Sequence, residues 1–286
     1  MDKILSLSIC QMKVGNDKDE NLKKAGEMIA AAAGEGAEMV ILPEVFNSPY
    51  QAELFPRYAE SFPGPSTDFL AAAARKHGLC VVGGTIIERD SQGKIYNSSF
   101  VFDERGKLIG RHRKAHLFDI DIPGRISFHE SDTLTAGESI TIVRYKSHLF
   151  ALMICYDCRF PELSRAAALE GAELLVIPAA FNTTTGPAHW KLLMRCRAVD
   201  NQLFVVAASP ARNPSASYQA WGHSLVVDPW GDILQEAGSG EEIIHARLDF
   251  SRLEQVRQEL PLLRQRRKDL YRLDYKAPGN GIVFEK

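Results

Sequence analysis

The sequence predicts an α/β fold in which two mixed β-sheets pack together and helices cover their outer faces. Predicted strands and helices alternate along much of the chain, yet elsewhere several strands follow one another directly, which favours mixed sheets over one parallel sheet. The 286 residues, 45% hydrophobic and 24% charged, are enough for a large core. We see neither an internal repeat nor a low-complexity linker, so residues 1–286 are expected to form a single domain.

The first elements are a strand, a helix and a second strand. Residues 5–12 alternate between apolar and polar side chains, as in a strand. Residues 18–34 place apolar side chains at helical spacing and stop at Gly34, which favours a helix end. The sequence EMVILPE, residues 38–44, is typical of a short buried strand.

A second helix is expected over about residues 67–77, and three consecutive strands follow it. These strands cover residues 79–89, 96–104 and 107–114, with Gly and Asn-Ser turns as punctuation. Their direct succession, beside strands that alternate with helices, indicates a mixed sheet.

The second half repeats the alternation of strand and helix. Strands are expected at residues 148–155, 172–181, 203–210, 223–229, 232–237 and 242–249, and helices at residues 161–171 and 187–202. Two long loops, residues 47–65 and 118–130, are candidates to line an active site, because long ordered loops in compact domains are often functional.

Charge and cysteine content indicate a cytoplasmic protein with a small-molecule partner. The net charge is −2, from 34 basic and 36 acidic residues, which suggests binding neither to nucleic acid nor to an anionic membrane. The odd number of cysteines, 5 in all, does not resemble a secreted disulfide framework. The N-terminus lacks a cleavage-like site, and no apolar run approaches the roughly 18 residues of a membrane helix.

The basic run at residues 264–272 is interpreted as a solvated helix or an intersubunit arm, within a C-terminal extension from about residue 260 to 286.

Three chemically active side chains follow predicted strands. Glu44 comes just after MVIL, Lys114 after KLIGRHR, and Cys155 after LFALMI. Ligands bind at strand ends in open α/β sheets. Singly, these residues are ordinary as a loop acid, a surface charge and a small buried hydrophobe. Together they supply a base, a cation and a nucleophile, the parts needed for acyl transfer.

Two other patterns suggest different chemistry. Cys155 and Cys158 form a C-x-x-C pair ahead of a predicted helix, so a thiol-disulfide redox protein is the alternative of another class. That reading leaves Glu44 and Lys114 unexplained, and Cys158 is interpreted as having no role in the chemistry. His112 and His116 are four apart, but at a strand exit this spacing does not bring two imidazoles onto one face, so we expect surface histidines and no metal site.

Three motifs resemble the signatures of the nitrilase superfamily of carbon–nitrogen hydrolases. They are LPEVF around Glu44, HRKAHLFDIDIPG around Lys114 and ICYDCRFPEL around Cys155, in this order. The segments FNTTTGPAHW, RAVDNQ, ASPAR and WGHSLVVDPWG resemble the ω-amidase branch in particular. The resemblance implies a four-layer α-β-β-α sandwich, a Glu-Lys-Cys triad, no metal or organic cofactor, and assembly into homodimers or larger forms.

The implied chemistry is amide hydrolysis through a thioester on Cys155. Glu44 would accept the thiol proton and later activate water, because a free thiol is only a few per cent ionised at neutral pH. The Lys114 ammonium and the Tyr156 backbone N–H would stabilise the oxyanion. Glu130 matches an additional glutamate that relatives place near the lysine; otherwise it is an exposed loop acid.

The resemblance also implies a substrate class. In the ω-amidase branch the corresponding region binds dicarboxylic acid monoamides such as 2-oxoglutaramate and 2-oxosuccinamate. Arg159 is expected to grip the distal carboxylate, unless it forms a surface or structural ion pair. Phe181, Thr185 and Tyr50 are expected to shape the pocket. Hydrolysis of N-carbamoyl amines or of deaminated glutathione stays open as an alternative.

Overall fold

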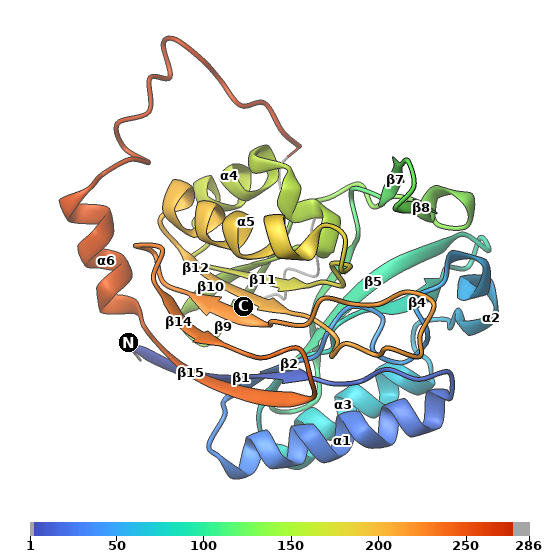
Figure 1. Cartoon of the computed structure of the whole chain (residues 1–286). Coiled ribbons are helices and arrows are strands. Elements are labelled where there is room, and N and C mark those ends of the chain that lie inside the picture. Colours follow the sequence, from blue (N-terminus) through green and yellow to red (C-terminus); the bar gives the residue numbers. More distant parts are fainter. Residues whose placement is uncertain (1–2, 277–286) are drawn as a thin grey trace.

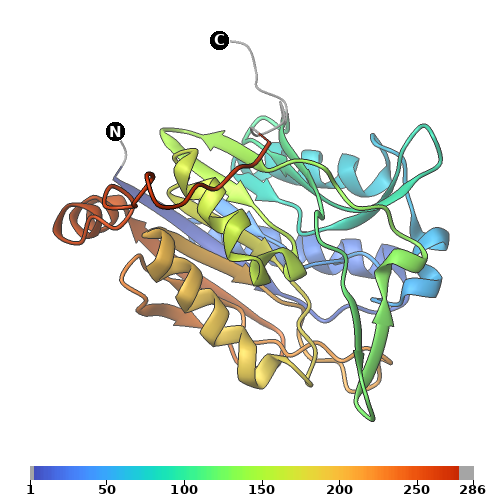
Figure 2. The same cartoon turned by 90° about the horizontal axis from the view of Figure 1, so that it is seen from above.

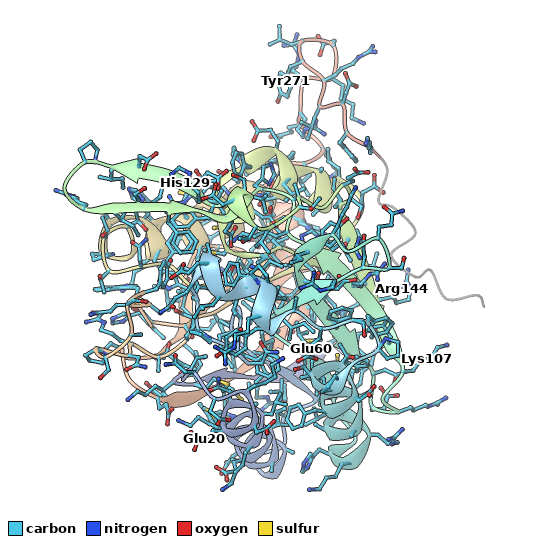
Figure 3. The ribbon with its side chains drawn as sticks, turned by 90° about the vertical axis from the view of Figure 1, so that its right-hand side faces the viewer. Glu20, Glu60, Lys107, His129, Arg144 and Tyr271 are labelled. Atoms are coloured by element: carbon cyan, nitrogen blue, oxygen red, sulfur yellow. The ribbon has the colours of Figure 1, made fainter. Side chains whose placement is uncertain are left out.

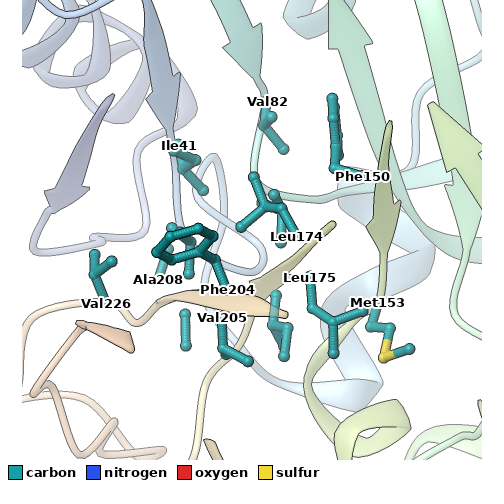
Figure 4. Packing of buried hydrophobic residues seen from close by; sticks show 14 of the residues in the cluster. Ile41, Val82, Phe150, Met153, Leu174, Leu175, Phe204, Val205, Ala208 and Val226 are labelled. Atoms are coloured by element: carbon teal, nitrogen blue, oxygen red, sulfur yellow. The ribbon is translucent and has the colours of Figure 1, made fainter. Parts of the chain in front are cut away.

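Two β-sheets pack face to face between helices in the computed structural model, which describes residues 3–276 (Figure 1). Apolar side chains of both sheets meet in one cluster, where Ile41 and Val82 of one sheet join Phe150, Leu174 and Phe204 of the other (Figure 4). The predicted four-layer α/β architecture with two mixed sheets is therefore confirmed. No helix within residues 3–276 is long and apolar enough to cross a membrane.

The first sheet has the N-terminal strand next to one edge. The strand order is β15 (Glu242–Asp249), β1 (Ile4–Gln11), β2 (Met39–Ile41), β3 (Cys80–Val82), β5 (Ile95–Phe102) and β4 (Ile86–Arg89), and β6 (Leu108–Arg113) also pairs with β5. β1 is parallel to β2, β2 is parallel to β3, and the remaining pairs are antiparallel.

The second sheet has the strand order β14 (Ile233–Glu236), β13 (Leu225–Val227), β12 (Phe204–Ala208), β11 (Leu174–Pro178), β10 (His148–Leu152) and β9 (Thr141–Tyr145). β10, β11 and β12 are parallel to one another, and the other pairs are antiparallel.

The outer helices bury their apolar faces on these sheets. α1 (Lys18–Gly34) and α3 (Pro65–His77) cover the first sheet, where Val40 of β2 faces Ile29 and Leu70, while its neighbour Ile41 faces the second sheet. α4 (Pro161–Leu169) and α5 (Gly186–Asn201) lie side by side over the second sheet (Figure 2).

Several local predictions were wrong. Residues 79–89 form two strands, β3 and β4, because Gly84 adopts a positive φ of 54° between them. Asn97 and Ser98 lie inside β5 rather than in a turn. The strand β9 and the helix α6 (Phe250–Glu259) were not predicted.

Both long loops contain regular structure. Residues 47–65 include a 3₁₀ turn, η1 (Ala52–Leu54), and a short helix, α2 (Phe55–Tyr58). Residues 118–130 form a hairpin of β7 (Asp119–Ile122) and β8 (Ile126–His129), which projects from the body of the molecule with His129 on it (Figure 3).

The C-terminal segment follows α6. Of the two interpretations of residues 264–272, the helix is wrong, since turns and irregular chain occupy these positions, and the intersubunit arm stays a prediction. The segment runs alongside α4 (Figure 2), where the Tyr275 hydroxyl donates to Glu170 Oε1 at 2.9 Å. The remainder of the predicted extension, residues 277–286, lies outside the described residues.

Candidate active site

The side chains predicted at three strand ends come together between the two sheets. Glu44 follows β2, Lys114 follows β6, and Cys155 follows β10, and all three are nearly or completely buried. Lys114 Nζ lies 2.9 Å from Glu44 Oε1. A buried ammonium and a buried thiol thus share one carboxylate as a neighbour.

Glu44 is held by more than the lysine. Its Oε1 accepts a hydrogen bond from Asn97 Nδ2 at 2.9 Å, and the Tyr50 hydroxyl oxygen lies 3.4 Å away. Among residues 3–276, Oε2 has no hydrogen-bond partner, and the Cys155 thiol lies close enough to this carboxylate to lower its pKa. One oxygen of Glu44 is therefore fixed by donors, which leaves the other for proton exchange with sulfur.

Glu130 is fully buried, so its alternative interpretation as an exposed loop acid is wrong. Its Oε2 accepts the Phe118 backbone N–H at 2.7 Å, and Lys114 Nζ lies 2.9 Å from the same oxygen. The Tyr50 hydroxyl donates to Glu130 Oε1 at 2.7 Å. The hairpin β7–β8 carries Glu130 back to the lysine, because the two ends of the hairpin meet beside Lys114.

The electrostatics of this cluster suit acid–base chemistry. Burial raises the pKa of Glu44, the Lys114 charge opposes this rise, and the Glu130 charge adds to it. Burial alone would lower the pKa of Lys114, but Glu130 and Glu44 outweigh it and hold that pKa well above its usual value. Burial and the Glu44 charge raise the pKa of the Cys155 thiol, which therefore stays protonated until a base takes the proton.

Cys155 occupies a strained turn. It begins the 3₁₀ helix η3 (Cys155–Arg159) with a positive φ of 45°, and Val45, next to Glu44, has a φ of 49°. Such conformations cost about 1–3 kcal/mol in non-glycine residues and concentrate at functional sites. Burial and the Glu44 charge raise the pKa of the Cys155 thiol more than the nearby Ala180 backbone, just after β11 (Leu174–Pro178), lowers it.

Arg159 lies at the end of η3 and is only partly buried. Its guanidinium carbon lies 4.6 Å from the Phe181 ring centroid, and its Nη1 lies 3.1 Å from His189 Nδ1. The guanidinium only donates, so this nitrogen of His189 is the acceptor. No carboxylate within residues 3–276 forms an ion pair with Arg159, so the alternative interpretation as a surface or structural ion pair finds no partner in the described chain.

The other predicted pocket residues are distributed over different positions. Tyr50 contacts Glu44 and Glu130 directly. Thr185 precedes α5, and its hydroxyl donates to Asn182 Oδ1 at 3.2 Å. The Tyr156 ring packs edge-on against Phe118, with ring centroids 5.2 Å apart.

A cavity of about 220 Å³ adjoins the cluster. Glu44, Tyr50, Ala180 and Tyr218 line one part of it, together with Asn213 and Ser217 from the loop before β13. Arg159, Phe181, Thr185 and Cys155 are not among its lining residues. The cavity is large enough for a small molecule, and it approaches the cluster from the Glu44 side.

Several contact residues were missed in the sequence. Asn97 was taken for part of a turn, although three consecutive polar residues that are buried in a strand, Asn97 to Ser99, signal a functional contact. The expectation that His112 is a surface residue was wrong, because His112 is 1% exposed and its ring contacts Asp157.

Burial raises the pKa of the Cys158 thiol to about 12, which opposes a reactive dithiol. No group of three or more metal-binding side chains occurs within residues 3–276.

Comparisons with known proteins agree on one family. The family model described as carbon-nitrogen hydrolase matches residues 6–258. The chain is 50% identical to omega-amidase NIT2 of Mus musculus over 272 residues, which covers 95% of this chain and 98% of that protein. The corresponding protein of Homo sapiens is 49% identical over 272 residues, with the same shares covered. The crystal structure of Saccharomyces cerevisiae Nit3, a member of branch 10 of the nitrilase superfamily, superposes with a TM-score of 0.85 at 47% identity, over 92% of this chain and 97% of that one.

Proposed function

The chain belongs to the carbon–nitrogen hydrolase family, and from this premise we propose that it is an ω-amidase. It hydrolyses the terminal amide of a small dicarboxylic acid monoamide, such as 2-oxoglutaramate or 2-oxosuccinamate, and releases ammonia. The observation that carries this proposal is the buried Lys114 ammonium, which contacts Glu44 and Glu130 beside the Cys155 thiol. The identity with two omega-amidases at about half of all positions supports the substrate class.

In the acylation step, Cys155 is the nucleophile and Glu44 the general base. Glu44 takes the thiol proton while the sulfur attacks the amide carbon, and it then delivers a proton to the departing ammonia. The raised pKa of Glu44 suits this role, because a base works best when its pKa approaches the operating pH.

The oxyanion of the tetrahedral intermediate is stabilised by the Lys114 ammonium and the Tyr156 backbone N–H. The high pKa of Lys114 keeps it charged throughout the cycle. Removing one such donor typically costs about 2.7–4 kcal/mol of transition-state stabilisation. Glu130 and Tyr50 support the lysine and Glu44 through their mutual hydrogen bonds.

In the deacylation step, Glu44 acts a second time. It activates a water molecule against the Cys155 thioester, and the carboxylic acid product leaves with the thiol restored. Over the whole cycle, one amide and one water molecule are converted to one carboxylic acid and one ammonia. No metal or organic cofactor takes part in these steps.

Arg159 selects the substrate in this proposal. Its guanidinium is oriented by the Phe181 ring and has no carboxylate partner in the described chain, which supports a contact with the distal carboxylate of the substrate. Phe181 contacts this guanidinium, and a substrate that reaches Arg159 extends beyond the lining of the cavity beside Glu44. The cavity beside Glu44 gives the small amide group and water access to the base.

Ammonia release across a substrate panel tests the function. The panel contains 2-oxoglutaramate, 2-oxosuccinamate, succinamate, N-carbamoyl amines, deaminated glutathione and simple nitriles, with Cys155→Ala as the inactive control. We expect the dicarboxylic monoamides to exceed all other compounds in kcat/KM by at least about tenfold, which corresponds to about 1.4 kcal/mol. A preference for an N-carbamoyl amine or for deaminated glutathione would replace the ω-amidase assignment with that alternative.

We further propose a homodimer in the cytoplasm. All five cysteines are free thiols, as expected in a reducing compartment. The helix α5 exposes Leu192 and Val199 on its outer face, with 60% and 40% of their surfaces accessible, which suits a helix-mediated interface. Sedimentation equilibrium tests this arrangement, and a monomer at micromolar concentration would contradict it.

A further inference from the structure

A buried carboxylate joins the nucleophile turn to the segment that carries Lys114. Asp157 lies two residues after Cys155 and is completely buried. Its Oδ2 lies 3.1 Å from His112 Nε2, and its Oδ1 lies 2.8 Å from His116 Nδ1. These two histidines stand two residues before and two residues after Lys114.

Backbone groups complete the coordination of Asp157. The His116 N–H donates to Oδ1 at 2.9 Å, and the Ile154 N–H donates to Oδ2 at 3.0 Å. Burial alone would raise the pKa of Asp157, but the hydrogen bonds from His112, His116 and Ile154 hold it well below its usual value. Asp157 is therefore an ionised acceptor, and each histidine nitrogen that faces it carries a proton.

The strand geometry explains why His112 reaches this site. Side chains alternate across β6, so His112 and Lys114 face the interior, while Arg111 and Arg113 face outward to Glu88. The second ring nitrogen, His112 Nδ1, lies 3.1 Å from Thr141 Oγ1 of β9. His112 thus links the first sheet to the second sheet and to the nucleophile turn.

His116 is fixed from a different direction. Its ring stacks on Phe160, with centroids 3.7 Å apart and an interplanar angle of 11°. Its side chain is 32% exposed, so it tolerates substitution better than the buried His112 does. Both ends of the Lys114 segment are consequently attached to one residue of the Cys155 turn.

We propose that His112, Asp157 and His116 form a clamp that sets the position of the Lys114 ammonium relative to the Cys155 sulfur. None of the three needs to touch the substrate, so they are positioning residues for the reaction. The clamp also restrains Ile154 and Asp157 on either side of the strained Cys155 backbone. This proposal rests on the proposed roles of Lys114 and Cys155.

Substitution of each histidine by asparagine and by glutamine tests the clamp, because the amide nitrogen of each residue takes the place of one of the two imidazole nitrogens. The Nε2 of glutamine occupies the place of histidine Nε2, and the Nδ2 of asparagine occupies that of Nδ1. At position 112, His112→Gln keeps the donor to Asp157, whereas His112→Asn keeps only the side facing Thr141. At position 116 the order reverses, since His116→Asn keeps the donor and His116→Gln displaces it.

We expect glutamine to preserve kcat better than asparagine at position 112, and asparagine to preserve it better than glutamine at position 116. His112→Gln and His116→Asn should retain kcat within about fivefold, whereas His112→Asn should lose about 10²-fold, as expected for a misplacement of about 1 Å. His116→Gln should lose about tenfold, because the His116 backbone contact remains. KM should change less than about threefold in all four variants, because the substrate contacts are intact.

Melting temperatures and Cys155→Ala complete the design. Each variant is assayed at least 10 °C below its own melting temperature, which separates positioning from loss of fold. If the Gln and Asn variants at each position had equal kcat, or if only KM changed, the clamp would be refuted. The proposed function would still stand in that case, provided that Cys155→Ala was inactive. Activity of Cys155→Ala would instead refute the proposed function, so the two failures are distinguishable. The 116 pair decides the question if both buried His112 variants fail to fold.

Discussion

The substitution Arg159→Met removes a cation from the proposed carboxylate site and keeps a side chain of similar length. The methionine can still pack on the Phe181 ring, since a thioether sulfur contacts aromatic rings favourably. The change therefore isolates the charge and the hydrogen bonds of the guanidinium from its packing.

The expected loss follows from the environment of Arg159. Two opposite charges about 4 Å apart attract by about 4 kcal/mol at an effective dielectric constant near 20, and the partial exposure of this side chain reduces the value. A hydrogen bond to a charged group contributes about 1.5–3 kcal/mol. A net range of about 2–4 kcal/mol corresponds to a loss of roughly 30- to 10³-fold in kcat/KM.

Steady-state ammonia release on a matched pair of substrates measures this loss. Succinamate carries the distal carboxylate, and butyramide carries a methyl group in its place. Arg159→Met should lower kcat/KM for succinamate by this whole range and change kcat/KM for butyramide by less than about threefold. Arg159→Lys should recover only part of the loss, because an ammonium lacks the planar geometry of the guanidinium. An equal decline on both substrates would refute carboxylate recognition and would assign Arg159 to the support of η3.

The remaining predictions concern Glu44, pH and Cys158. Glu44→Gln should slow both acylation and deacylation by about 10²- to 10⁴-fold in single-turnover kinetics, and unimpaired acylation would exclude Glu44 as the base. Because burial raises the pKa of Glu44, and the carboxylate is active when ionised, kcat/KM should rise with pH through a value above the usual ~4.3. The high pKa values of Lys114 and Cys155 predict no alkaline decline up to about pH 9, so a decline between pH 7 and 9 would contradict these assignments. Cys158→Ala should keep most of the activity, and equal loss in Cys155→Ala and Cys158→Ala would favour the redox alternative.

The three residues that meet at the site were predictable from local patterns alone. The apolar runs before Glu44, Lys114 and Cys155 end in polar residues, and strands that pack in one core bring their ends together. Local periodicity also identified the four covering helices, with errors of a few residues at their ends.

The hairpin over residues 118–130 was not predicted, since each of its strands has only four residues around Pro123 and Gly124. The burial of Glu130 depends on this hairpin, so the sequence left an exposed acid as the alternative. Once the hairpin forms, the Phe118 N–H, Tyr50 and Lys114 all reach the carboxylate.

His112 was misjudged because its neighbours suggested a solvated strand. Arg111 and Arg113 do face outward, where they pair with the buried Glu88. Side chains alternate between the two faces of a strand, so His112 lies on the opposite face, together with Lys114. The alternation alone could have indicated an interior histidine. Its partner Asp157 could not have been inferred, since that contact joins two segments 45 residues apart.

Of the two interpretations of residues 264–272, the solvated helix was wrong for an energetic reason. The segment contains few apolar side chains and exposes Leu270 and Tyr271, so no apolar face stabilises a helix against a sheet. Arg267 instead pairs locally with Asp269 at 2.6 Å.

Intact-mass spectrometry of the acyl-enzyme tests the central claim most directly. The wild-type protein, Cys158→Ala and Cys155→Ala are each quenched in acid during turnover of a slow dicarboxylic monoamide, and the modified peptide is then located by fragmentation. A thioester on Cys155 should add the mass of the acyl group in the first two proteins and be absent from the third, which should release no ammonia. Full turnover by Cys155→Ala, or an adduct on Cys158, would contradict the mechanism.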